Sequence, residues 1–349
     1  MNMRTYFVAG TLAATSALGI VAAVNYLIDV NGIYRTGSLQ KYTAEYVRQM
    51  RGSRFGVRHV PFDRAVKIEL ARQSSAACYV TGSSKEMSIS LDRMPPLKER
   101  CPSLVNLAES GGSYEDAVTL LAIATQRKAS SVLIGIGPWF FLLNADKRWT
   151  EFANDYQSAR IFFDLKPVGN SIYEEKLLNL INGAYFVRNL ETILRRKGNK
   201  LPPVVEAQAD GKNLANDDPI FRPDGSITYS RVFLEQAKPQ DNVECRDYRV
   251  KPPFVNQEVV AEFRQVVQKI QQQNIQVTFV LMPFHPGVFR CHGLTVPAVE
   301  KTEQTVTELA AKLNAPIIGS YNPTRFELLP ADFYDFMHVA AGSLHKIVR

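Results

Sequence analysis

The sequence predicts an α/β fold built on a parallel β-sheet. Short apolar segments with the character of strands alternate with segments whose apolar residues recur at helical spacing. The strand segments are almost continuously apolar, as expected for a sheet that is covered on both faces. The chain has 349 residues, of which 46% are hydrophobic and 21% charged, so it can bury a large core and is not expected to be disordered.

The first predicted element is an apolar helix at the N-terminus. No charged residue occurs from Thr5 to Ile28, and a helix of that length measures about 36 Å, enough to cross a bilayer core. We therefore expect residues 1–30 to be a membrane anchor. A cleaved signal peptide is the alternative, because Val21-Ala22-Ala23 offers small residues for cleavage, but the apolar segment is longer than usual for one. The flanking positive charges do not set the orientation of the helix.

The rest of the chain divides into a short polar segment and one domain. Residues 31–75 are polar and rich in arginine, and we interpret them as a stalk together with the entry segment of the fold. Residues 76–349 are the α/β domain. Its first part is predicted to contain a helix that begins after Ser113 and three strands: helix 113–128 and strands 76–82, 102–110 and 130–141.

The regular alternation stops from about residue 145 to residue 254. We expect an insertion or cap there, made of loops and one long helix at 173–198. The alternation then resumes, with a clear apolar stripe in the next helix. The second part of the domain is predicted to contain two helices, two strands and a short terminal helix: helices 255–274 and 296–314, and strands 275–286 and 315–321.

The charge of the chain bears on its partners. The formal net charge is +7, which suits a negatively charged partner such as a membrane surface or an acidic glycan. We expect no nucleic-acid partner, because the basic residues are scattered and no recognition motif accompanies them. The two densest basic stretches, at 47–60 and 194–200, are interpreted as solvated surfaces.

Cysteine spacing and known motifs give no sign of a metal or cofactor. The four cysteines, Cys78, Cys101, Cys245 and Cys291, form no CxxC pair, and the chain has no P-loop or zinc pattern. We therefore expect neither a metal site nor a cofactor. One or two disulfides would fit an exported domain, and the sequence leaves their pairing open.

Candidate functional residues follow the predicted strands. In a parallel sheet the carboxyl ends of the strands meet at one edge, where ligands bind. The candidates, in strand order, are Ser84, Gly111 with Gly112, Trp139, His285, and finally Asp335 with His338.

These residues are the parts of an acyl-transfer site. The Ser84 hydroxyl would attack a carbonyl carbon, His338 would take its proton, Asp335 would orient the imidazole, and glycine amides would bind the oxyanion. Each residue also has a structural explanation. Ser84 could cap a helix after the first strand, the two glycines could form a tight turn, and His338 could be a packed histidine. Their common position after strands favours the site.

Three blocks resemble the SGNH (GDSL-type) hydrolase superfamily: "VTGSSKEM", "NLAESGGSYED" and "YDFMH". They are most similar to its membrane-anchored envelope branch, which includes the alginate acetylation proteins and the D-alanine transfer protein of teichoic acid pathways. The resemblance implies a flavodoxin-like three-layer sandwich. It also implies Ser84 as nucleophile, Gly111 as an oxyanion amide, and Asp335 and His338 as the orienting acid and the base.

The third block of this family departs from the expected pattern. It usually supplies a Gly-x-Asn whose side chain is an oxyanion donor, and losing such a donor can cost on the order of 10² to 10³ in rate. Here the strand ends Gly135-Ile136-Gly137-Pro138-Trp139, and the next asparagine is Asn144. Trp139 could instead form a wall for an acyl group or sugar ring, or belong to the core. His285 could contact substrate, or be part of the loop structure.

The resemblance implies a single-pass protein of the bacterial inner membrane with its main domain outside the cytoplasm. It would be a serine-dependent O-acyltransferase or esterase that moves an O-acyl group, first of all acetyl, on an envelope polysaccharide. A membrane-bound O-acyltransferase would be its partner. One alternative is a catalytically degenerate member that binds glycan or scaffolds an export complex. Another is a lipase or esterase that faces the cytoplasm. The sequence does not name the polymer or the acyl donor.

Overall fold

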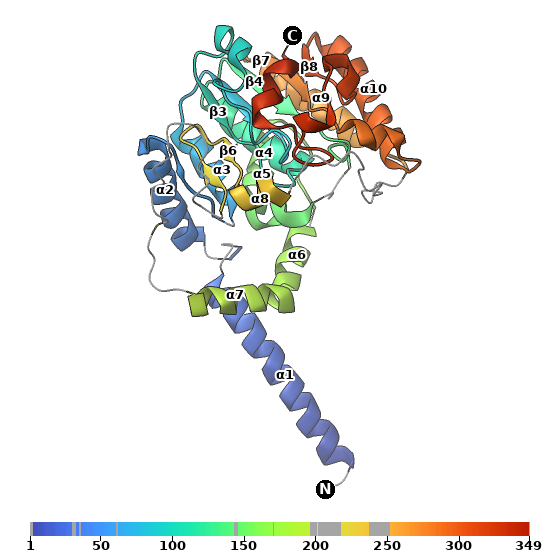
Figure 1. Ribbon diagram of the computed structural model, residues 1–349. Helices are drawn as coiled ribbons and strands as arrows, with labels where there is room; N and C mark the ends of the chain where they lie inside the picture. The colour runs from blue at the N-terminus through green and yellow to red at the C-terminus, as the bar shows by residue number, and fades with distance from the viewer. Residues whose placement is uncertain are drawn as a thin grey trace.

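The computed structural model describes residues 3–29, 33–34, 36–60, 62–142, 146–169, 171–195, 201, 218–236 and 252–348. The fold is α/β, as predicted, with a five-stranded parallel sheet flanked by helices (Figure 1). The strands of this sheet are β2 (Cys78–Thr81), β3 (Leu104–Asn106), β4 (Ser131–Gly135), β7 (Gln276–Leu281) and β8 (Ile317–Gly319).

The order of the strands places a switch point beside β2. They lie in the order β3-β2-β4-β7-β8, and every neighbouring pair is parallel. Counted along the chain this is the doubly wound order found in flavodoxin, in which ligands bind at the switch point between the first and third strands. Here those strands are β2 and β4. The loop that follows β2 therefore begins at the edge where a site is expected.

The sheet has an apolar core on each face. Tyr79 and Val132 belong to a large cluster that also contains residues of the flanking helices. Their strand neighbours Val80 and Leu133 belong to a second cluster. Because successive side chains of a strand point to opposite faces, the two clusters lie on opposite sides of the sheet. The nearly continuous apolar character of the strands follows from this burial on both sides.

All five predicted strands are present, but three end well before their predicted bounds. The second, predicted at 102–110, ends at Asn106. The third, predicted at 130–141, ends at Gly135, and the fourth, predicted at 275–286, ends at Leu281. Pro138 and Pro286 lie just beyond these ends, and proline has no N–H to donate to a neighbouring strand. The apolar residues that follow are buried in loops rather than in the sheet.

The predicted helices between strands are also present. Ser113 caps the first of them, with a reciprocal contact to Asp116 that forms a capping box. The short terminal helix is a 3₁₀ helix. These elements are α4 (Tyr114–Gln126), α9 (Gln257–Gln271), α10 (Thr295–Leu313) and η6 (Ala341–Ile347).

The interpretation of residues 31–75 as a stalk is wrong. The segment contains α2 (Thr36–Gly52), β1 (Val57–Arg58) and α3 (Asp63–Gln73). Nearly every residue of α3 is buried, and this helix packs against both α2 and α4. The charged residues of α3 that are buried include Arg64 and Lys67, and Arg64 is paired with Asp116. This segment therefore belongs to the folded body.

The segment 145–254 is an insertion with its own short elements. Its hairpin strands β5 (Ile220–Phe221) and β6 (Ile227–Thr228) form a small antiparallel sheet with β1. The insertion is thereby joined to the segment that precedes the main sheet. Its other elements are η2 (Lys147–Phe152), α5 (Ala153–Phe162), α6 (Ser171–Leu180), α7 (Gly183–Arg195) and α8 (Arg231–Gln236).

The single long helix predicted at 173–198 is two helices, α6 and α7. The break lies at Ile181 and Asn182. The Asn182 side chain accepts a hydrogen bond from the Tyr185 N–H at 3.0 Å, so it caps α7 and starts a new helix. The carbonyl of Asn182 is also bonded to Asn25 of the N-terminal helix, at 3.1 Å. A contact with a distant residue therefore stabilises the break.

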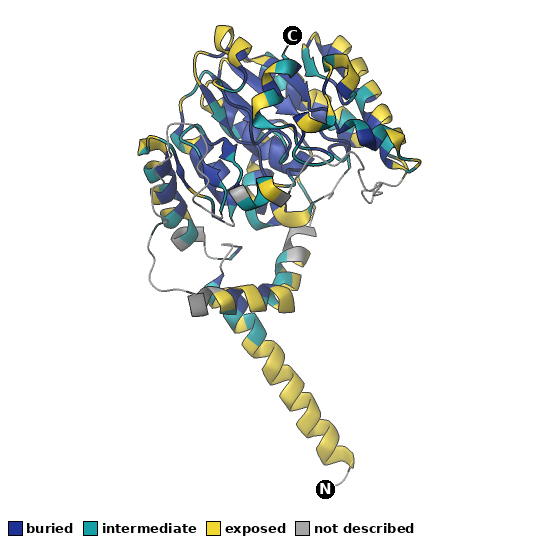
Figure 2. Ribbon diagram, viewed as in Figure 1, coloured by how far each residue is buried: buried dark blue, intermediate teal, exposed yellow. Residues whose placement is uncertain are grey.

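The N-terminal helix α1 (Met3–Ile28) projects away from the folded body (Figures 1 and 2). It is the one helix in the described part of the chain that is long and apolar enough to cross a membrane. Most of its residues are exposed, and its C-terminal end contacts α6 and α7. By length and composition it could therefore span a membrane.

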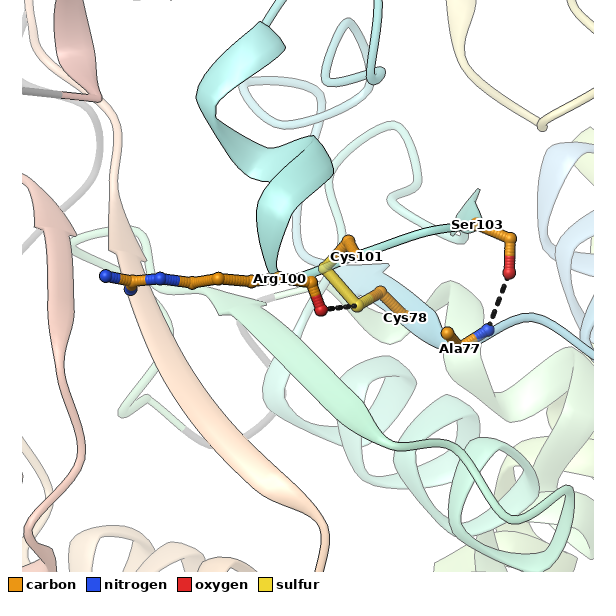
Figure 3. The surroundings of a disulfide bond; sticks show 5 residues. All are labelled: Ala77, Cys78, Arg100, Cys101 and Ser103. Carbon is orange, nitrogen blue, oxygen red and sulfur yellow. Dashed lines mark hydrogen bonds between the residues drawn. A yellow bond between two sulfur atoms is a disulfide. The ribbon is translucent and has the colours of Figure 1, made fainter.

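A disulfide joins Cys78, at the start of β2, to Cys101, just before β3 (Figure 3). The two cysteines are 23 residues apart in the sequence, and Ser84 lies between them. Beside the disulfide, the Ala77 N–H donates to Ser103 Oγ at 2.9 Å. None of the cysteines that the structure describes is a free thiol.

Candidate active site

Ser84 lies in the turn that follows β2. Residues 84–88 form turns and no helix, so Ser84 does not cap a helix there. Asn106, at the end of the neighbouring strand β3, holds this turn in place. Its buried Nδ2 donates to the carbonyls of Glu86 at 2.8 Å and Ile89 at 2.9 Å. We call residues 82–88 the nucleophile turn.

The structure brings Ser84, His338 and Asp335 together in one chain of hydrogen bonds. Ser84 Oγ lies 2.9 Å from His338 Nε2, although the two residues are 254 positions apart. His338 Nδ1 lies 2.7 Å from Asp335 Oδ2. The side chains of His338 and Asp335 are 15% and 28% exposed, so a small substrate can reach the imidazole.

Asp335 is held as a carboxylate. Burial alone would raise the pKa of this group. The hydrogen bond and charge of His338, together with the backbone N–H groups of Met337 and His338, outweigh burial and lower the pKa below its usual value. Both N–H groups donate to Oδ1 at 2.8 Å. The carboxylate therefore favours the tautomer in which Nδ1 carries the proton and Nε2 can accept one from Ser84.

Two buried ionisable residues follow Ser84 directly. Lys85 Nζ donates to the Met282 carbonyl at 2.7 Å and lies 3.5 Å from the centre of the Phe284 ring. Burial lowers the pKa of Lys85 to about 7, although the charges of Glu86 and Asp335 act in the opposite direction. Burial also raises the pKa of Glu86, against the charge of Lys85. Groups with shifted pKa values gather at functional sites, and these two adjoin the candidate nucleophile.

No model of a known protein family matches this chain, and a search of curated proteins gives no match either. The chemistry of the site therefore has to be inferred from its own residues and geometry.

Gly112 packs against the nucleophile turn. A Cβ atom on this glycine would lie 2.2 Å from the Gly82 carbonyl oxygen, so the close approach requires glycine. The Gly112 N–H donates to the Glu109 carbonyl at 3.1 Å. That N–H is engaged within its own turn, and the expectation that Gly112 lends its amide to an oxyanion is not supported.

Gly111 remains the better candidate for an oxyanion amide. Its φ of 63° lies in the left-handed region, where glycine is favoured. In the described part of the chain its N–H has no hydrogen-bond acceptor. The carbonyl of the same peptide, that of Ser110, accepts from Arg148 at 2.9 Å, and the Gly111 carbonyl accepts from Arg64 at 3.3 Å.

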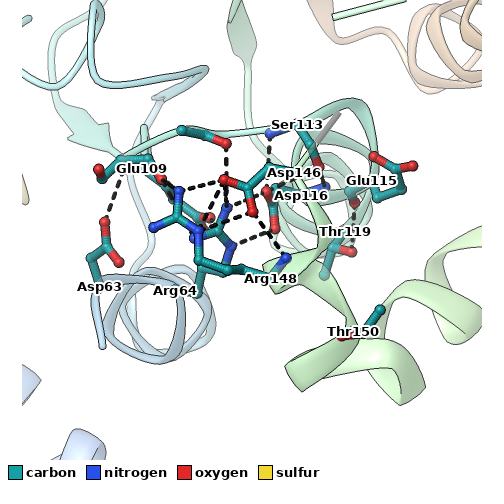
Figure 4. Close-up of polar contacts among 12 residues, drawn as sticks. Asp63, Arg64, Glu109, Ser113, Glu115, Asp116, Thr119, Asp146, Arg148 and Thr150 are labelled. Atoms are coloured by element: carbon teal, nitrogen blue, oxygen red, sulfur yellow. Dashed lines mark hydrogen bonds and ion pairs between the residues drawn. The ribbon is translucent and has the colours of Figure 1, made fainter. Parts of the chain in front are cut away.

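A buried cluster around Arg64 holds the loop 109–112 (Figure 4). Arg64 donates to both oxygens of Asp116, at 3.0 and 2.8 Å, and its Nε lies 3.5 Å from Glu109 Oε2. Asp63 accepts from the Ser110 N–H at 2.9 Å. Burial raises the pKa of Glu109, as does the neighbouring charge of Asp116. The buried Arg64 and the carboxylates around it thus hold the loop 109–112 in place.

Trp139 lies after β4, partly buried against the main core. A Cβ on Gly137 would approach its ring at 3.1 Å, so the indole lies over that glycine. The Ile136 carbonyl before it accepts from the Tyr321 hydroxyl at 2.6 Å. The third sequence block, in its described residues 136–142, has no side-chain amide that could serve as an oxyanion donor. Asn144 lies outside the described residues.

His285 supports the loop of Asp335 and His338, and the expectation of a substrate contact is not supported. It is only 2% exposed. Its Nδ1 accepts from the Gly287 N–H at 2.9 Å, and its backbone N–H donates to the Phe336 carbonyl at 2.9 Å. The ring also packs on Phe333. It therefore joins the end of β7 to the loop that carries the candidate base.

An aromatic group from the insertion lies beside the candidate base. The Tyr229 hydroxyl donates to the Ser84 carbonyl at 3.2 Å, and its ring centre is 6.1 Å from that of His338. Phe233 stacks on Tyr229 at 4.6 Å, and Tyr334 meets Tyr229 edge-on at 5.5 Å. These contacts could not be predicted from the sequence, because Tyr229 and Phe233 lie in a part of the chain without a regular pattern.

The described structure also has a cavity away from Ser84. A cavity lined by Ser131 and Gln276 lies at the starts of the strands, on the opposite edge of the sheet from Ser84. Among the described residues, no group of three or more His, Cys, Asp or Glu side chains is arranged to hold a metal ion.

Proposed function

We propose that the protein is a membrane-anchored serine enzyme of the SGNH hydrolase type that transfers or hydrolyses an O-acyl group. The observation that carries this proposal is the chain of hydrogen bonds from Ser84 through His338 to Asp335. It lies at the switch point of a doubly wound sheet, where such folds bind ligands. Two of the three sequence blocks that resemble the family supply these residues, and the other supplies Gly111.

The geometry supports a two-step reaction. Ser84 Oγ attacks the acyl carbon while His338 Nε2 takes its proton, and Asp335 stabilises the imidazolium. The N–H of Gly111 is a candidate donor to the oxyanion. His338 then gives the proton to the leaving oxygen, and an acyl-serine remains. Water or a sugar hydroxyl then attacks this ester while His338 takes its proton, and His338 returns the proton to Ser84 Oγ as the bond between serine and the acyl group breaks.

The proposed substrate is an acylated polysaccharide of the cell envelope, with acetyl as the first acyl group to test. Tyr229, Phe233 and Tyr334 offer aromatic faces of the kind that pack on sugar rings, and the net charge of +7 suits an acidic polymer. A membrane-bound O-acyltransferase remains the proposed source of the acyl group.

The proposed location is the bacterial inner membrane, with α1 as a single span and the main domain outside the cytoplasm. The apolar exposed helix supports the anchor. The disulfide between Cys78 and Cys101 supports an oxidising compartment, because such bonds rarely persist in the cytoplasm. This also argues against a lipase or esterase that faces the cytoplasm.

A catalytically degenerate protein that binds glycan is the second candidate. It is favoured by the third block, whose described residues place no side-chain amide near Ser84. Without that donor the oxyanion would be less well stabilised, by on the order of 10² to 10³ in rate.

A serine-directed fluorophosphonate probe and a model acetyl ester distinguish the serine enzyme from the catalytically degenerate protein. With purified full-length protein in detergent, Ser84→Ala should abolish labelling, and His338→Asn should lower ester hydrolysis by on the order of 10⁴-fold. Ser158→Ala and His345→Asn, at exposed sites, are the matched controls and should behave like the unaltered protein. Unchanged hydrolysis in Ser84→Ala would refute the enzyme, and glycan binding without labelling of the unaltered protein would favour the second candidate.

A further inference from the structure

The segment of α6 and α7, residues 171–195, is fastened to the end of α1. Asn25 is fully buried there, and its Nδ2 donates at 3.0, 2.9 and 3.1 Å to three carbonyls in the turn between the helices: those of Asn179, Leu180 and Asn182. Its Oδ1 accepts from Asn189 at 3.1 Å. We call residues 171–195 the α6–α7 segment.

A second contact lies one turn further along α1. The Tyr185 hydroxyl donates to Asp29 Oδ1 at 2.8 Å, and Tyr185 is buried. Asn25 and Asp29 thus both contact α7, which runs across the end of α1 rather than alongside it (Figure 1). The two fastenings set the direction of α7 relative to α1.

These contacts lie at the level where a membrane span would end. A bilayer core is crossed by about 20 helical residues. Counted from Thr5, the start of the uncharged stretch, such a span ends near Asn25. A protein that crosses the membrane with α1 therefore places α7 at the boundary between the acyl chains and the head groups.

The α6–α7 segment exposes large apolar side chains. Outside α1, the described residues with exposed large apolar side chains fall mainly in this segment, with exposed fractions of 64%, 58%, 51% and 53%: Leu177, Leu178, Ile181 and Val187. Elsewhere in the described chain only Ile161, Leu294 and Leu329 are comparable, and they are scattered. Exposed apolar side chains that gather in one segment normally mark a contact with a membrane or a protein.

Helix α7 is amphipathic, with its apolar side left open. Phe186, Val187 and Leu190 lie on one side, and Arg188 and Glu191 lie on the adjoining side. None of these three apolar residues is buried, because the side of α7 that faces α1 carries Tyr185 and Asn189 instead. A helix with this distribution, held at the level of the head groups, has the character of an interfacial helix.

We propose that the α6–α7 segment lies in the surface layer of a phospholipid bilayer and gives the protein a second membrane contact beside α1. The bilayer is the favoured occupant because the segment is fixed to α1 at the depth where lipid begins. A membrane protein seated on the same face is the competing occupant. The proposal does not depend on the proposed enzymatic activity.

Site-directed fluorescence tests this in the full-length protein. A single cysteine is introduced by Val187→Cys and labelled with an environment-sensitive fluorophore, since none of the described native cysteines is a free thiol. The protein is then reconstituted in phosphatidylcholine vesicles that carry a lipid-bound quencher. Arg188→Cys is the matched control, because one residue along a helix turns the probe by about 100° onto the charged side. Leu12→Cys, in α1, reports insertion.

We expect a blue shift at position 187 and quenching several-fold greater than at position 188, with strong quenching at position 12. Val187 is exposed, so its replacement should leave the thermal unfolding midpoint unchanged. Strong quenching at position 12 with equally weak quenching at 187 and 188 would overturn the proposal and leave the face to a protein partner. Absence of quenching at position 12 would overturn it as well, because the depth argument requires α1 to cross the bilayer.

Discussion

Arg64 is a sensitive point in this fold because it is buried among carboxylates and holds the loop that ends at Gly112. Replacing it with methionine removes both hydrogen bonds to Asp116 and the contact with the Gly111 carbonyl. Glu109 and Asp116 then remain buried without their cation. Neither Ser84 nor His338 contacts Arg64 directly, so any loss of activity would report the position of the loop.

The structure allows the size of this effect to be worked out. Breaking a buried ion pair by removing one partner costs about 3–5 kcal/mol, because an uncompensated charge is left behind. Arg64 is 3% exposed, so this range applies to it. Arg64→Lys keeps the charge but loses the paired geometry to Asp116, and should cost less. The control is Arg72→Met, whose ion pair with Asp155 is 39% and 28% exposed and is worth about 0–1 kcal/mol.

Urea unfolding followed by tryptophan fluorescence measures these losses. The chain has 2 tryptophans, and Trp139 and Trp149 both lie in blocks that adjoin the site. Ester hydrolysis by the folded fraction should fall by up to about 10²-fold in Arg64→Met if the Gly111 N–H is displaced. Equal stability of Arg64→Met and Arg72→Met would refute the reasoning about the buried cluster. Full activity in a destabilised Arg64→Met would refute its link to the loop.

Three further predictions concern the surroundings of Ser84. Gly112→Ala places a Cβ 2.2 Å from backbone and should cost about 1–3 kcal/mol in urea unfolding, whereas Gly169→Ala, in open space, should be neutral. Burial lowers the pKa of Lys85 from 10.5 to about 7. Above about pH 7 the unfolded chain therefore binds a proton that the folded chain does not, so the unfolding free energy should rise with pH. Lys85→Met should lose this rise between about pH 7 and 8, whereas the buried Lys67, whose pKa is lowered to about 8, should maintain a slope at higher pH. The disulfide closes a loop across a separation of 23 residues. Removing it by Cys78→Ala with Cys101→Ala should lower the unfolding free energy, measured in urea, by about 3 kcal/mol.

Each of these predictions has a result that contradicts it. Equal stability of the two glycine variants would mean that the loop can move away from the nucleophile turn. If the unfolding free energy of Lys85→Met rose with pH between about 7 and 8 as steeply as that of the unaltered protein, the rise would belong to another group. An unchanged urea midpoint without the disulfide would mean that the cross-link does not restrict the unfolded chain.

The main sheet could be predicted because its strands follow a local rule. Burial on both faces makes each strand apolar throughout, and Gly, Pro or Ser residues mark the ends. The same rule predicted that Ser84, Asp335 and His338 follow strands, and the structure brings them within hydrogen-bond distance. Strand order restricts the sheet to a few arrangements, but it does not by itself bring His338 to Ser84, since β4 and β7 lie between β2 and β8. The chain after β8 runs back past the end of β7, where the His285 N–H donates to the Phe336 carbonyl.

What could not be predicted depends on contacts between distant residues. Residues 36–73 look solvated in sequence because their charges are paired only after folding, as Arg64 is with Asp116. The break between α6 and α7 has a local signal in Asn182, which caps α7, but the bond of its carbonyl to the distant Asn25 could not be predicted. The engagement of the Gly112 N–H and the approach of Tyr229 to Ser84 are likewise properties of the folded chain.

The fastening of Asn25 has a practical consequence for anyone who wants this protein without its anchor. Cutting the chain after residue 30 removes the amide that three carbonyls of the α6–α7 turn share, and strips Tyr185 of the carboxylate that its hydroxyl meets. In the truncated protein these carbonyls would lack a hydrogen-bond donor and would lie next to the exposed side chains of Leu177 and Leu178, a combination that promotes aggregation. A water-soluble version should therefore lose residues 171–195 together with α1.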